Sequence, residues 1–86
     1  MFSRKTILTL VDALDFQTHN DVERFCVEFE IEQVIDNLSY IKQKETAISK
    51  YLIANKEAKG PMGSALVVEV IEYLLKNKYP SGERFI

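Results

Sequence analysis

The chain has 86 residues, of which 47% are hydrophobic and 28% are charged, and its formal net charge is −2. These values predict one globular domain and argue against a dedicated nucleic-acid binder, which normally has a net basic surface. A single cysteine, Cys26, excludes an internal disulfide and favours a reducing, cytoplasmic compartment.

The three glycines and two prolines all follow residue 59, and this scarcity of helix breakers favours an all-α chain. We expect a first helix over about residues 4–14, with the hydroxyl of Ser3 as its N-cap. A second helix is expected to begin near Asn20, with Glu23 three residues later in the pattern of a capping box. Its apolar stripe comprises Val22, Phe25, Cys26 and Phe29.

A second apolar stripe follows, made of Ile31, Val34, Ile35 and Leu38. At about 100° per residue, the two stripes would lie on opposite sides of one straight helix. A single helix could therefore bury only one of them. We expect a break between Phe29 and Ile31, followed by a short third helix over about residues 31–37.

The next helix is expected over about residues 43–57, with its lysines pointing outward and Gly60 as the left-handed residue after it. The last helix, over about residues 64–77, is apolar around most of its circumference. Such a helix is surrounded by others, so we expect it at the centre of the fold. Two glutamates, Glu69 and Glu72, interrupt it, which excludes a membrane span.

Together these elements predict a compact five- to six-helix bundle. We expect a single helical domain over residues 1–80. Residues 81–86 are interpreted as a tail or the start of a linker.

Catalytic and metal-binding patterns are weak in this sequence. His19 and Cys26 are the only residues of their types, and on one helix they would stand about 10 Å apart along the axis. That separation is too long for a nucleophile and its base. One histidine and one cysteine do not suffice for a zinc site, and residues 60–64 lack the ending of a phosphate-binding loop. The sequence therefore predicts a protein that is not an enzyme and that has no cofactor or metal.

Charge is divided unevenly along the chain. Residues 12–36 contain eight acids against one base, whereas residues 37–60 contain five lysines against two acids. Exposed charges of both signs can meet their complements on another copy or on a partner. The expected protein-binding patches are acidic at Glu28, Glu30, Glu32 and Asp36, and basic at Lys42, Lys44 and Lys50. A solvated lysine face, or pairing of the two regions within one molecule, are the alternatives.

Several residues carry a resemblance to a known group. They are residues 10–14 with Phe16, then Phe25 and Phe29, Leu38, Gly60, and the helix at 66–75 that closes at residues 79 and 80. This order of helices and apolar spacings resembles the bacterial effector-associated domains, which are death-like adaptor domains of prokaryotic conflict systems. The resemblance implies a death-fold-like helical bundle without catalysis, in which a domain pairs with a like domain.

We therefore expect a non-enzymatic interaction module that associates with a like domain or with another copy of itself, and that recruits effectors in a bacterial conflict or signalling system. No membrane partner is expected, and a nucleic-acid partner is disfavoured. The alternative is a free-standing small inhibitor or regulator, such as an antitoxin or phage antagonist, that binds a protein target. The sequence does not identify the partner or the stoichiometry.

Overall fold

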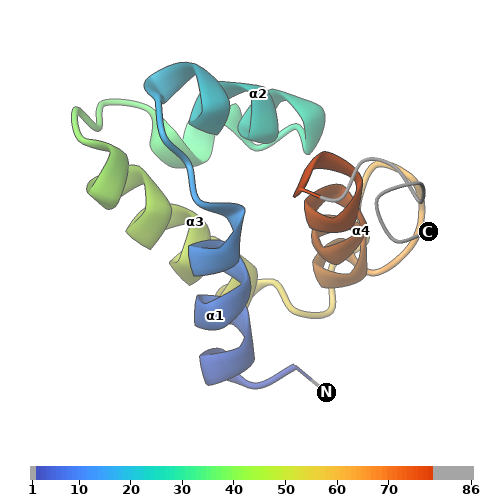
Figure 1. The fold of residues 1–86 in the computed structure, drawn as a ribbon. Helices are drawn as coiled ribbons and strands as arrows, with labels where there is room; N and C mark the ends of the chain where they lie inside the picture. Colours follow the sequence, from blue (N-terminus) through green and yellow to red (C-terminus); the bar gives the residue numbers. More distant parts are fainter. Residues whose placement is uncertain (1, 79–86) are drawn as a thin grey trace.

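The structure is a computed structural model and describes residues 2–78. Within them lie the α-helices α1 (Arg4–Leu14), α2 (His19–Glu28), α3 (Ile41–Ala54) and α4 (Leu66–Lys78), and the short 3-10 helix η1 (Glu32–Ile35) (Figure 1). The all-α prediction is confirmed. The predicted count of five to six helices is wrong, because the described residues form four α-helices and one 3-10 turn. The predicted tail at residues 81–86 lies outside the described residues.

Side-chain caps fix the starts of the first two helices. The hydroxyl of Ser3 accepts a hydrogen bond of 3.0 Å from the backbone N–H of Thr6, as predicted. Helix α2 is capped by Thr18 instead of Asn20. Thr18 Oγ1 accepts from the N–H of Asp21, and the Asp21 carboxylate accepts from the N–H of Thr18, each at 3.1 Å. This reciprocal pair starts the helix earlier than predicted and places Asn20 inside its first turn.

The predicted break after α2 is confirmed, and a Schellman motif makes it. The backbone N–H of Ile31 donates to the carbonyl of Cys26 at 2.8 Å, and the N–H of Glu30 donates to the carbonyl of Val27 at 3.1 Å. Glu30 adopts a left-handed conformation with φ of 60°, the position that usually holds glycine. The reversal lets Phe29 and Ile31 both enter the core, with 6% and 3% exposure.

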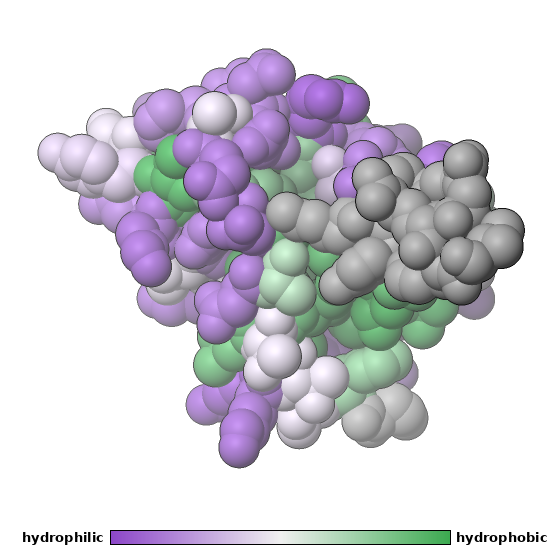
Figure 2. Space-filling view, viewed as in Figure 1, coloured by the Kyte–Doolittle hydropathy of each residue, from purple (hydrophilic) through white to green (hydrophobic). Residues whose placement is uncertain are grey.

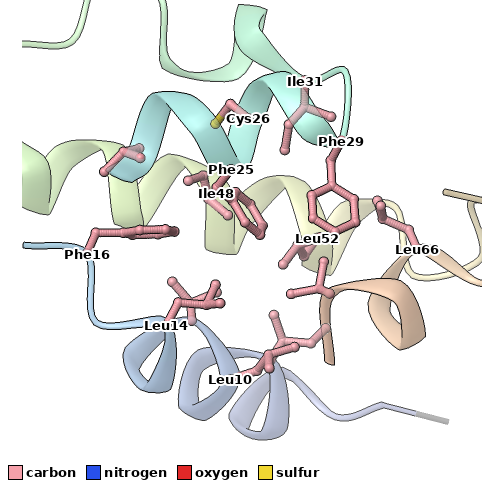
Figure 3. Close-up of a cluster of buried hydrophobic side chains, with 14 of the residues drawn as sticks. Leu10, Leu14, Phe16, Phe25, Cys26, Phe29, Ile31, Ile48, Leu52 and Leu66 are labelled. Atoms are coloured by element: carbon pink, nitrogen blue, oxygen red, sulfur yellow. The ribbon is translucent and has the colours of Figure 1, made fainter. Parts of the chain in front are cut away.

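Helix α3 lies at the centre of the packing, because α1, α2 and η1 each contact it. Its buried residues Ile48 and Leu52 meet side chains of α1 and α2 in one apolar core (Figure 3). The predicted central position of α4 is wrong. Helix α4 packs on α1, and its Tyr73 ring meets Phe25 at a centroid distance of 5.2 Å. The far side of α4 faces solvent, with Leu75 52% exposed.

The connection between α3 and α4 differs from the prediction. Helix α3 ends at Ala54, six residues before Gly60, and Asn55 caps it through the carbonyls of Tyr51 and Leu52. The glycine with positive φ is Gly63, at 92°, and not Gly60. Residues 60–64 form a tight turn that contains Gly63. A hydrogen bond of 2.7 Å from the N–H of Gly60 to the carbonyl of Ser64 closes it.

Across residues 2–78, no helix has both the length and the apolar character that crossing a membrane requires.

Candidate functional site

Four exposed carboxylates lie along the path from the end of α2 through the Schellman turn and η1, and we call them the acidic ridge: Glu28, Glu30, Glu32 and Asp36. Glu32 and Asp36 line one hollow, whereas Glu28 and Glu30 each line a different one. Val27 lies beside the acidic ridge and is 57% exposed. Val27 lines a shallow hollow together with Glu23, Glu32 and Asp36. In the view of Figure 2, the upper part of the molecule, which α2 forms, is mostly hydrophilic.

The three predicted basic residues do not share one surface. Lys44 is only 6% exposed, so the prediction that it faces solvent is wrong. Its ammonium lies 3.1 Å from Nδ1 of His19 and donates to that nitrogen, which places the imidazole proton on Nε2. Lys44 also lines the same hollow as Glu32 and Asp36, so one cation borders this part of the ridge.

The sequence contained a signal for this burial. Positions 44, 48 and 52 are spaced four residues apart and fall on one face of a helix. Ile48 and Leu52 on that face are fully buried. A lysine can join such a face by laying its aliphatic stem along apolar neighbours and presenting its charge to a polar partner.

The other two lysines line a groove between α1 and α3. Lys42 and Lys50 are exposed and line this α1–α3 groove, which has a volume of about 520 Å³. Leu8, 45% exposed, lies in the same groove. The remaining lining residues include Val11, Ile53 and Ala54, the cation Arg4, and the acids Asp12 and Glu45. The charged lining therefore carries three cations against two acids.

Sequence reasoning missed Arg4 and Leu8 as parts of this surface. Leu8 is 45% exposed, whereas its neighbours on α1 at positions 7, 10 and 11 are buried. Only the packing of α1 on α3 shows that Leu8 and the two lysines share a groove. Within residues 2–78, the ridge carboxylates make no hydrogen bond or ion pair with Lys42 or Lys50, so these two lysines do not neutralise the ridge internally.

The two residues with possible nucleophilic or acid–base chemistry are separated. Cys26 is fully buried, and burial, followed by the nearby carboxylate of Glu32, raises the pKa of its thiol to about 12. His19 bonds to Lys44 instead. Among residues 2–78, no group of three or more His, Cys, Asp or Glu side chains is arranged to hold a metal ion.

The buried acid Glu69 has a structural role. Glu69, at the start of α4, is 3% exposed. Its carboxylate accepts hydrogen bonds from the backbone N–H groups of Met62, at 3.1 Å, and of Ser64, at 2.7 Å. A Cβ atom at Gly60 would overlap a Glu69 oxygen, so glycine there allows the close approach of the carboxylate and does not serve a left-handed backbone.

Comparisons with protein-family models, with curated proteins and with solved structures find no match to this chain.

Proposed function

We propose that this chain is a non-enzymatic interaction module that associates head to tail with a like domain or with another copy of itself. The observation that supports the proposal is a pair of different surfaces on one small fold. One is the acidic ridge with Val27 beside it, and the other is the α1–α3 groove with Leu8 and the exposed Lys42 and Lys50. The exposed Val27 beside the ridge carboxylates fits a groove that holds apolar side chains and carries one more cation than acids.

The two surfaces use different residues, so each molecule keeps one surface free after binding through the other. Such a heterologous contact forms rings or open filaments. Exposed charge pairs each contribute up to about 1 kcal/mol, so the contact needs several of them together with burial of Val27 and Leu8. Recruitment of an effector in a bacterial conflict or signalling system, the role implied by the resemblance, would use this association.

A charge exchange tests the proposal. One variant carries Glu28→Lys, Glu32→Lys and Asp36→Lys, which makes the ridge basic because three lysines then stand against Glu30. A second variant carries Lys42→Glu and Lys50→Glu, which makes the groove acidic. Each variant alone presents two surfaces of like charge and should not associate. An equimolar mixture should associate again, because each ridge then finds a groove of opposite charge. Static light scattering at low salt measures this, and Lys5→Glu, an exposed residue of α1 that does not line the groove, is the control.

Salt provides an independent measurement. The screening length falls from about 10 Å at 0.1 M salt to about 3 Å at 1 M, so the weight-average mass of the unmodified protein should decrease across that range. A protein that sediments as a strict monomer at high concentration and low salt, and that binds no like domain, contradicts the proposal.

A further inference from the structure

One hydrogen bond between titratable side chains joins the start of α2 to α3. The ammonium of Lys44, on α3, donates to Nδ1 of His19, the first residue of α2, at 3.1 Å. The two residues are 25 positions apart in the chain, so the bond is a contact between elements and not part of a helix. Lys44 is only 6% exposed, whereas His19 is exposed to solvent. A proton can therefore reach the imidazole while the chain stays folded.

This bond requires a neutral imidazole. A neutral ring has one nitrogen that accepts and one that donates, whereas both nitrogens of a protonated ring donate. The ammonium of Lys44 has three donors and no acceptor. Protonation of His19 therefore removes the acceptor that Lys44 uses and places a second positive charge beside a buried lysine. Imidazole side chains change charge between about pH 5 and 8, so mild acid is the range that matters.

The other charged groups around the pair are carboxylates. Glu23 lies four residues after His19 on α2. Glu32 is the first residue of η1, and Asp36 follows its last residue. All three line one hollow with Lys44, so they offer its ammonium other acceptors once the imidazole no longer accepts.

Repulsion by Lys44 outweighs the attraction that these carboxylates exert on a protonated imidazole. The carboxylates of the hollow and the ring of His19 are all exposed, and water and salt screen interactions between exposed charges. The ammonium of Lys44 is buried and in direct contact with the ring, so its charge is screened much less.

We propose that the contact between His19 and Lys44 is an acid-sensitive link between α2 and α3. At neutral pH the imidazole accepts from the ammonium and joins the first turn of α2 to α3. In mild acid the protonated imidazole repels the ammonium, which turns to the carboxylates of the hollow. The contribution of the link to stability is therefore present where the imidazole is neutral and is lost as pH falls. This inference does not depend on association of the chain with a partner.

Urea unfolding tests the link at pH values of about 7.5 and 5.5, towards the two ends of the imidazole range. The comparison chain carries His19→Gln, whose amide oxygen accepts a hydrogen bond at both pH values. Acidification should lower the urea midpoint of the unmodified chain more than that of the His19→Gln chain. The carboxylates are the same in both chains, so the difference isolates the imidazole. Equal losses in the two chains overturn the proposal.

Removal of the lysine charge gives a second readout. Lys44→Met keeps an unbranched side chain but has no ammonium. In that background His19→Gln should no longer change the loss of urea midpoint on acidification, because no cation lies beside the ring. This double-mutant cycle assigns the pH dependence to the pair of residues, and circular dichroism confirms that each variant is folded at both pH values. A His19→Gln effect that persists without Lys44 overturns the proposal, since the pH dependence then has another origin.

Discussion

Lys44 and Glu69 show how charged residues can be buried in a fold of this size. Lys44 reaches the imidazole of His19, and Glu69 receives two backbone N–H groups at the start of a helix. Each buried charge is therefore hydrogen-bonded, as burial requires. Neither arrangement could be predicted from the sequence, because each joins the side chain to a partner whose position depends on how the chain turns between them.

Cys26 is expected to be unreactive in the folded protein. Burial raises the pKa of its thiol from 9.0 to about 12, so the nucleophilic thiolate is scarce near about pH 8. Labelling with a thiol reagent should be slow under native conditions and rapid in denaturant. Because the folded pKa lies above the unfolded one, the thiol's contribution to stability is complete below pH 9.0 and is lost as pH rises towards 12. Native labelling at the denatured rate contradicts this expectation.

The Schellman turn places one residue of the acidic ridge in a strained backbone conformation. Its left-handed position is occupied by Glu30, with φ of 60°, where a side chain is strained and glycine is not. The break itself could be predicted, because two apolar stripes cannot share one straight helix. The means of the break could not be predicted, because no glycine marks the position. Asp15 and Asn37 also have positive φ, at 50° and 68°, so Glu30 is one of three such non-glycine residues among those described.

Replacing Glu30 should separate stability from association. Glu30→Gly relieves the left-handed strain and should stabilise the fold by roughly 0.5–1 kcal/mol, measured as a higher urea midpoint. The same change should weaken head-to-tail association, because a ridge carboxylate is lost. Glu28→Gly is the matched control. It is the last residue of α2, where the backbone is helical, and glycine there should destabilise the fold. A Glu30→Gly protein less stable than the unmodified one contradicts the argument.

Over the whole molecule, the stability depends on one core that α1, α2, α3 and α4 share. The full burial of Ile48 on the central helix makes it a sensitive probe of that core. Ile48→Ala should lower the free energy of unfolding by about 2–5 kcal/mol, a large part of the roughly 5–15 kcal/mol available to a domain. Leu8→Ala, on the half-exposed side of α1, should cost much less. Urea unfolding of both variants makes the comparison, and equal losses contradict it.

The features that could be predicted from the sequence are those that depend on the periodicity of apolar residues. The all-α class, the first helix at 4–14 and the burial of Cys26 all rest on apolar spacing within one segment, which local rules describe. The α1–α3 groove and the contact between Lys44 and His19 depend on how segments far apart in the chain pack together. The central position expected of α4 failed for the same reason, because an apolar circumference does not show which neighbours cover it.

The close approach of Gly60 to Glu69 also describes a pattern that can be sought in other chains. A side chain at position 60 would occupy the space that the carboxylate fills, so the two residues depend on each other. A glycine followed nine positions later by a glutamate, with apolar residues on either side of that glutamate, is a compact signature of this turn.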